Sequence, residues 1–274
     1  MDEIRNVDIN PEYRAELLEI IQNFRLMDDT FMAKVFEDKE CAELLLRIVL
    51  GRDDLTVVRV VSQFELKNLQ GRSARLDIYA VDDQGKQFDI EVQRDDGGAA
   101  PKRARYNSSL MDANSLQPGE RFDNLPESYV IFITEHDVLK GGKPLYTINR
   151  TVSELDHAIF ADESHIIFVN GEIKGGSALG ELMQDFFCQD PNEMHYKPLS
   201  KRAGYFKEDK EGVDTMCKLM EDYAEKRARE AANEKSVSFA LNLWNSGMRD
   251  LKQIAALTEL PLDEVKKLFE GKTA

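Results

Sequence analysis

Two short segments with strand periodicity, joined by a turn, constrain the fold of this chain most strongly. In residues 75–81 and 88–93, apolar side chains recur at every second position, and strand-forming residues are common. Residues 82–85 between them read Asp-Asp-Gln-Gly, with glycine where a hairpin needs a positive φ. We therefore expect an antiparallel hairpin. Because the side-chain period of a strand is two, Asp77 faces away from its apolar neighbours, and Glu91 and Gln93 share one face of the second strand.

The flanking segments predict a mixed α/β fold. Apolar residues at helical spacing predict helices over residues 11–24, with Asn10 as N-cap, and over residues 28–50, with Gly51 at the end. Pro101 opens another expected helix. Residues 129–134 form a continuous apolar run, which is typical of a strand buried on both faces. Further strands are expected at 145–148 and 166–169, and a helix at 177–187.

The composition changes near Lys207. Residues 208–235 are nearly all helix formers and charges, which predicts an exposed or bridging helix or a weak coiled coil. Residues 237–269 have the spacing of a helix-turn-helix, with Trp244 as its core anchor and Ala255 where the helices cross. Its second helix is nearly balanced in charge, which favours helix packing or a homodimer contact over DNA reading. We expect a domain over residues 1–206 and a helical tail over residues 207–274.

Charge and cysteine usage restrict the setting. The chain of 274 residues has 36 basic and 51 acidic residues, a net charge of −15, whereas a protein that coats nucleic acid is usually basic. Three scattered cysteines (Cys41, Cys188 and Cys217) form no disulfide framework, which favours a reducing cytoplasm. The acidic, polar start is unlike a signal peptide, and no apolar run is long enough for a membrane span.

The acids of the hairpin suggest a chemistry. If the chain turns at residues 83–85, Asp77 and Glu91 lie close together, and two carboxylates repel unless a cation lies between them. Hard divalent ions such as Mg²⁺, or Mn²⁺ in its place, take carboxylate, carbonyl and water oxygens, so the Val92 carbonyl would add a ligand. Gln93 could orient a metal-bound water. This arrangement suits metal-assisted phosphodiester hydrolysis.

Each of these features also has a plainer interpretation. Alternating acids are common on the solvated face of a hairpin, and on spacing alone this interpretation is favoured; Asp89 is taken as such a solvated residue. In the functional interpretation, Arg103 and Tyr106 of the helix after Pro101 contact a phosphate or support the acids. In the plainer one, the basic residues of this helix form a solvated face with Tyr106 in the core. Arg72 and Arg75 beside Asp77 could do either. The basic residues of that helix are Lys102, Arg103 and Arg105.

Residues 73–79 (SARLDIY) and 88–94 (FDIEVQR) resemble the signature of PD-(D/E)XK nucleases. More narrowly, they resemble the Rpn family of recombination-promoting, transposase-like nucleases. The supporting segments are residues 31–36, 44–46, 103–107, 125–126 and 129–135, in that order, and the resemblance covers residues 28–170. It implies a restriction-endonuclease-like core, a mixed sheet flanked by helices in αβββαβ order, here with a C-terminal helical extension.

The resemblance also implies a Mg²⁺-dependent DNA endonuclease in which Asp77 and Glu91 bind the metal. Gln93 stands where the wider superfamily often has Lys; the Gln variant is typical of this subfamily. A neutral amide can hold a water but supplies no positive charge. Asp29 would match an additional acid, although a cap or near-cap role is favoured. The expected nucleic-acid contacts are Arg75, Arg103, Arg105 and Tyr106. The alternative is a catalytically weak or inactive fold that serves as a binding or assembly module.

The distribution of charge bears on DNA binding. Residues 207–274 hold 12 basic and 14 acidic residues, so 24 basic and 37 acidic residues, net −13, fall in residues 1–206. Two or three metal-binding acids do not account for this excess. A local rim of basic residues around the hairpin would have to attract DNA. We therefore expect DNA binding that is weak, salt-sensitive or assisted by a partner.

Overall fold

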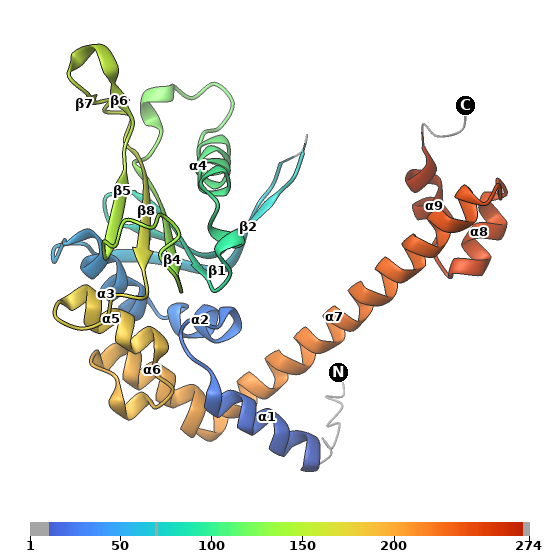
Figure 1. Ribbon diagram of the computed structural model, residues 1–274, viewed down its shortest axis with the longest axis horizontal. Coiled ribbons are helices and arrows are strands. Elements are labelled where there is room, and N and C mark those ends of the chain that lie inside the picture. The colour runs from blue at the N-terminus through green and yellow to red at the C-terminus, as the bar shows by residue number, and fades with distance from the viewer. Residues whose placement is uncertain (1–10, 69–70, 271–274) are drawn as a thin grey trace. The chain divides into compact units, whose positions relative to one another are not determined.

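The computed structural model of the chain describes residues 11–68 and 71–270, which include both strands of the expected hairpin. Asn10, the expected N-cap of the first helix, lies outside these residues. The chain divides after Val213 into two compact units. The first unit contains a sheet with its flanking helices, and the second is helical (Figure 1).

A six-stranded mixed sheet forms the centre of the first unit, with strand order β1-β2-β3-β4-β8-β5. The strands β1, β2 and β3 are antiparallel, β4 and β8 continue parallel to β3, and β5 returns antiparallel to β8. Their bounds are β1 (Val57–Leu66), β2 (Ala74–Asp82), β3 (Gln87–Gln93), β4 (Ser128–Thr134), β5 (Leu145–Ile148) and β8 (Ser164–Asn170). A small hairpin of β6 (Thr151–Val152) and β7 (Ala158–Ile159) precedes β8. With its helices, this sheet is the restriction-endonuclease-like core that the sequence predicts.

The helices of the first unit follow the predicted order with two differences. Their bounds are α1 (Pro11–Asn23), α2 (Asp29–Phe36), α3 (Lys39–Leu50), α4 (Pro101–Ser115), α5 (Ala178–Phe187) and α6 (Lys197–Glu208). The single helix expected over residues 28–50 is wrong, because the Asp38 side chain accepts the N–H groups of Glu40 and Cys41 and so caps a new helix. Gly51 ends α3 with a φ of 64°. Helix α6 was not expected from the sequence.

The middle of the sheet is buried on both faces. Val130 and Phe132 of β4 cluster with Ala104 and Leu110 of α4, and the Phe132 ring stacks on Phe168 with centroids 5.5 Å apart. The alternate residues of β4 point to the other face and are also fully buried. Both faces of β4 are covered, which explains why its apolar run is continuous. The neighbouring strand β3 is covered in the same way.

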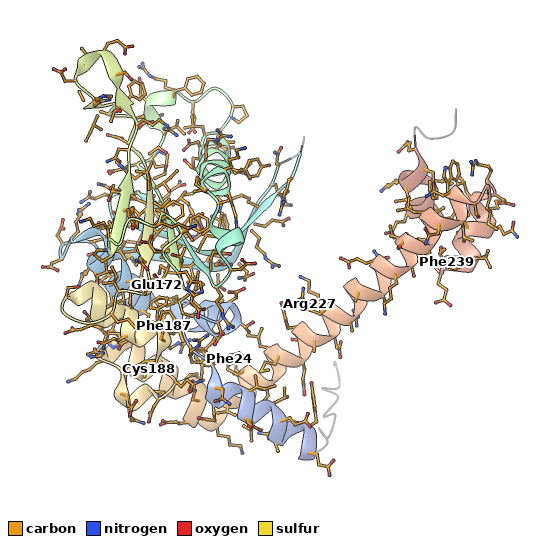
Figure 2. The ribbon with its side chains drawn as sticks, in the orientation of Figure 1. Phe24, Glu172, Phe187, Cys188, Arg227 and Phe239 are labelled. Carbon is orange, nitrogen blue, oxygen red and sulfur yellow. The ribbon has the colours of Figure 1, made fainter. Side chains whose placement is uncertain are left out.

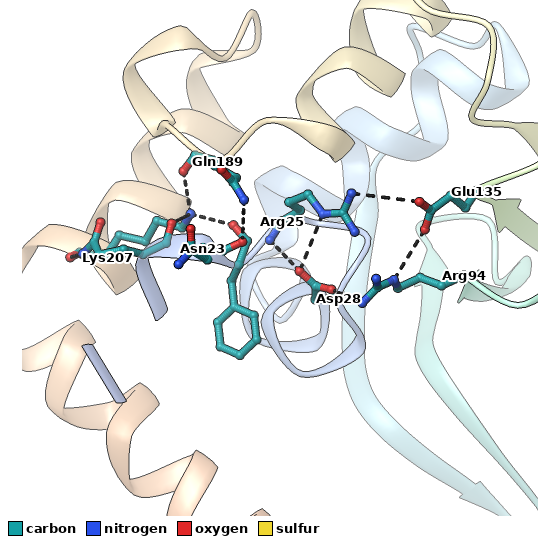
Figure 3. Close-up of polar contacts among 9 residues, drawn as sticks. Asn23, Arg25, Asp28, Arg94, Glu135, Gln189 and Lys207 are labelled. Carbon is teal, nitrogen blue, oxygen red and sulfur yellow. Dashed lines mark hydrogen bonds and ion pairs between the residues drawn. The ribbon is translucent and has the colours of Figure 1, made fainter. Parts of the chain in front are cut away.

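A buried lysine ties distant parts of the first unit together (Figure 3). Lys207 of α6 is 2% exposed, and its ammonium donates to the carbonyls of Gln22 at 2.9 Å, Phe24 at 2.6 Å and Gln189 at 2.5 Å. Burial lowers the pKa of Lys207 to about 8. Its three donors match three carbonyl acceptors, so the end of α1 and the segment after α5 are joined to α6.

The second unit contains α8 (Leu251–Thr258), α9 (Leu262–Phe269) and most of α7 (Lys210–Asn245). The helix expected over residues 208–235 is part of the longer α7, whose exposed side includes Arg227 and Phe239 (Figure 2). Trp244 stacks on Phe269 with centroids 4.3 Å apart, and it anchors the core as predicted. Among the helices that the structure describes, none combines the length and the apolar character of a membrane span.

Candidate active site

Asp77 of β2 and Glu91 of β3 face each other where the hairpin ladder ends. The last backbone pair on this side joins Ile78 to Ile90, so the register places Asp77 directly opposite Glu91. The Asp77 N–H donates to Glu91 Oε1 at 3.4 Å, and the Val92 N–H donates to Asp77 Oδ2 at 3.3 Å. Each carboxylate thus accepts an N–H of the neighbouring strand where the backbone ladder stops, and the two acids are held together.

The two acids of β3 lie inside the protein. Glu91 and Asp89 are both 0% exposed, because β3 is an interior strand and α4 covers the face that carries them. The interpretation of Asp89 as a solvated residue is therefore wrong. Its Oδ2 accepts from Asn107 Nδ2 of α4 at 2.9 Å, whereas its Oδ1 has no donor among the described residues. The hairpin does not have the solvated face that the plainer interpretation requires.

Burial and mutual repulsion disfavour the charged forms of these acids. Burial, with a contribution from the charge of Asp29, raises the pKa of Asp77 to about 6. Burial and the charge of Asp77 raise the pKa of Glu91 to about 7. Burial and the charge of Glu91 raise the pKa of Asp89 well above its usual range. Such a cluster either holds protons near neutral pH or binds a cation.

Asp29 adds a charge to this cluster. Asp28 occupies the N-cap position of α2, so Asp29 is the first residue of the helix and has the near-cap place favoured from sequence. Burial and the charge of Asp28 raise the pKa of Asp29, and Asp29 in turn raises that of Asp77. The structure therefore brings this acid to the edge of the candidate site, which the cap interpretation did not anticipate.

An ion-pair network fixes the start of α2 beside the end of β3 (Figure 3). Arg94, which follows Gln93, pairs with Asp28 at 2.8 Å and with Glu135 at 3.4 Å. Arg25 lies 4.0 Å from the same two carboxylates. Asp28 precedes Asp29, and Arg94 follows Gln93. The network therefore sets the positions of Asp29 and Gln93 relative to each other.

Arg103 of α4 and Gln93 both contact Glu91. The Arg103 guanidinium donates through Nη2 to Glu91 Oε2 and through Nη1 to the Gly98 carbonyl at 3.0 Å. It also lies 5.7 Å from the centroid of the Phe132 ring. Gln93 Nε2 donates to Glu91 Oε2 at 3.4 Å. Of the two roles considered for Arg103, this geometry matches support of the acids, and it brings a positive charge to the cluster.

The remaining basic candidates lie apart from the acids. The side chains of Arg75 and Arg105 are exposed, and in the described part of the chain no ion pair or hydrogen bond joins them to Asp77 or Glu91. The Tyr106 hydroxyl donates to the Arg72 carbonyl and accepts from Asn68 Nδ2 at 3.1 Å. Tyr106 therefore connects α4 to the segment before β2.

The donor chemistry of this site fits a hard divalent cation. The two converging carboxylates and the neighbouring Val92 carbonyl offer oxygen ligands, and repulsion between the acids would be relieved by a cation. Over residues 11–68 and 71–270, no three acid, His or Cys side chains form a ready-made metal site. Mg²⁺ is commonly bound through one or two carboxylates while it keeps several waters, and this set offers two carboxylates.

Comparison with known proteins identifies a family for this chain. Residues 34–172, about half of the chain, match the family described as PD-(D/E)XK nuclease family transposase. The matched segment contains all six strands of the sheet together with Asp77, Glu91 and Arg103. No curated protein and no solved structure gives a match. The chain belongs to the PD-(D/E)XK nuclease family of transposase-like proteins.

Proposed function

We propose that the protein is a metal-dependent DNA endonuclease that hydrolyses phosphodiester bonds. The observation that carries the proposal is the pair of carboxylates, the half-buried Asp77 and the buried Glu91, held against each other at the end of the β2–β3 ladder in a chain of a nuclease family. Mg²⁺, or Mn²⁺ in its place, would be held by these two acids and the Val92 carbonyl. When bound, the ion would lower the pKa of a coordinated water and neutralise charge on the phosphate.

The side chains around the acids have distinct roles in this reaction. Gln93 offers an amide donor and acceptor beside Glu91, so it can orient the attacking water but cannot take its proton. Arg103 supplies the positive charge that Gln93 lacks, because its guanidinium already lies on Glu91 Oε2. Arg75 and Arg105 are exposed and free to meet the DNA backbone, although the acidic surroundings predict weak, salt-sensitive binding.

A non-catalytic assembly module is the second candidate, and one observation favours it. Arg103 neutralises Glu91 in the protein alone, which is also how a nuclease fold without metal would satisfy its buried acid. In either case, we propose that the helices of residues 214–274 associate two copies. For an endonuclease with one site per chain, a homodimer would present one site to each DNA strand. The protein would act in the cytoplasm, as its three scattered cysteines suggest.

A plasmid-nicking assay tests the proposal. Supercoiled DNA is incubated with Mg²⁺, with Mn²⁺ or with chelator, and the wild type is compared with Asp77→Asn and Glu91→Gln, which keep the shape of each side chain. We expect nicking that requires the ion and falls by at least about 100-fold in both variants. Asp83→Asn, an exposed acid in the turn of the same hairpin, is the matched control and should cleave normally.

Two outcomes would contradict this assignment. Undiminished nicking by Asp77→Asn would remove Asp77 from the site. No nicking by the wild type at any salt concentration with either ion would favour the assembly module. In that case the oligomeric state, measured by light scattering with and without residues 214–274, becomes the informative quantity.

A further inference from the structure

Gly98 lies beside the candidate site in a conformation that does not itself need glycine. It belongs to the short 3₁₀ turn η1 (Asp96–Ala99) between β3 and α4. Its φ lies outside the left-handed region, so other residues could adopt this backbone. A Cβ at this position, however, would lie 1.9 Å from Gln93 Oε1 and 2.9 Å from Gln93 Cδ. Any side chain at position 98 would therefore occupy the place of the Gln93 amide.

The Gln93 amide is confined between this turn and Glu91. Its Nε2 donates to Glu91 Oε2 at 3.4 Å, while its Oε1 occupies the space that a side chain at position 98 would take. Arg103 holds the turn in place, because its guanidinium bonds both the Gly98 carbonyl and Glu91. A larger residue at position 98 would displace the end of the flexible Gln93 side chain before it displaced this anchored turn.

We propose that Gly98 is a positioning residue, which keeps open the space where the Gln93 amide lies beside Glu91. Gly98 thus belongs to the site, and Arg103 anchors it there through the Gly98 carbonyl. The consequence for catalysis rests on the proposed function, in which Gln93 orients the water. The placement of the amide does not depend on that function and can be tested separately.

The test replaces Gly98 with Ala in the full-length protein and follows Gln93 by NMR and by nicking. The side-chain amide resonances of Gln93 are assigned as those lost in Gln93→Ala. We expect Gly98→Ala to shift these resonances and to slow nicking by the same factor as Gln93→Ala, about 10- to 100-fold. The double variant should be no slower than Gln93→Ala. Gly97→Ala is the matched control, because its Cβ would come no closer than 3.6 Å to Asp95.

The outcomes separate this inference from the proposed function. Unmoved Gln93 resonances in Gly98→Ala, or a double variant slower than Gln93→Ala, would overturn the role of Gly98. If the wild type does not nick DNA, the proposed function fails while the NMR comparison still decides the inference. Melting temperatures guard against a folding defect: once Gln93 is replaced by Ala, adding Gly98→Ala should leave the melting temperature unchanged, and a further drop would point to the turn backbone instead.

Discussion

Replacing Glu91 with Gln should remove a pH dependence from the stability of the metal-free protein. Burial and repulsion by Asp77 raise the pKa of Glu91 from 4.5 to about 7. A carboxyl whose pKa is higher in the folded state stabilises the fold fully below the unfolded pKa, and this stability is lost as the pH rises through the folded pKa. At 1.36 kcal/mol per pKa unit, the wild type should lose about 3 kcal/mol of unfolding free energy between pH 4.5 and pH 8 that Glu91→Gln retains.

Urea unfolding in chelator at several pH values measures this difference. Hydrogen exchange of the β3 amides is the appropriate probe, since the single tryptophan, Trp244, lies in the second unit and would report on that unit. Glu225→Gln, which changes an exposed carboxylate of α7, is the control and should follow the wild type. Mg²⁺ at pH 8 should restore stability to the wild type but not to Glu91→Gln. Parallel pH curves for the wild type and Glu91→Gln would refute the reasoning.

Three further predictions concern the paired acids, Arg103 and the buried Lys207. Because Asp77 and Glu91 have pKa values of about 6 and 7, Mg²⁺ affinity measured by calorimetry should rise as the pH rises through this range; a flat profile would count against these ligands. Arg103→Met should bind Mg²⁺ more tightly yet cleave more slowly, since it removes a cation that competes for Glu91; a loss of both would indicate a structural role only. Lys207→Met should lower the unfolding free energy by about 3 kcal/mol, because three backbone carbonyls lose their ammonium donor. The exposed Lys201→Met should be neutral in the same denaturation assay.

The hairpin could be predicted from sequence because its determinants are local. Strand periodicity and the turn at residues 82–85 fix the register, and the register alone places Asp77 opposite Glu91. The burial of Asp89 could not be read in this way. It depends on β4, which lies beside β3, and on Asn107 of α4, and both come from later segments of the chain. The environment of these acids therefore required the tertiary structure.

Other features lacked a distinct local signal. The break between α2 and α3 depends on the capping side chain of Asp38, within apolar residues that keep helical spacing across it. Helix α6 has few apolar residues, and these pack against helices that are distant in the sequence. Arg103 contacts Glu91, and Gln93 lies against Gly98, only because η1 and α4 fold back onto the sheet. Residue spacing in the sequence does not predict this path of the chain.

The lysine anchor of α6 sets a lower limit on the size of a stable fragment. A chain trimmed to the family-matched residues 34–172 would lose α1, most of α2, and the helices α5 and α6 with Lys207. Phe36, which is 1% exposed, would lose the Phe186 ring stacked on it at 5.7 Å, and its side of the core would face water. Such a fragment should aggregate, whereas one that ends at Val213 should remain soluble. The autonomous folding unit is thus larger than the segment by which the family is identified.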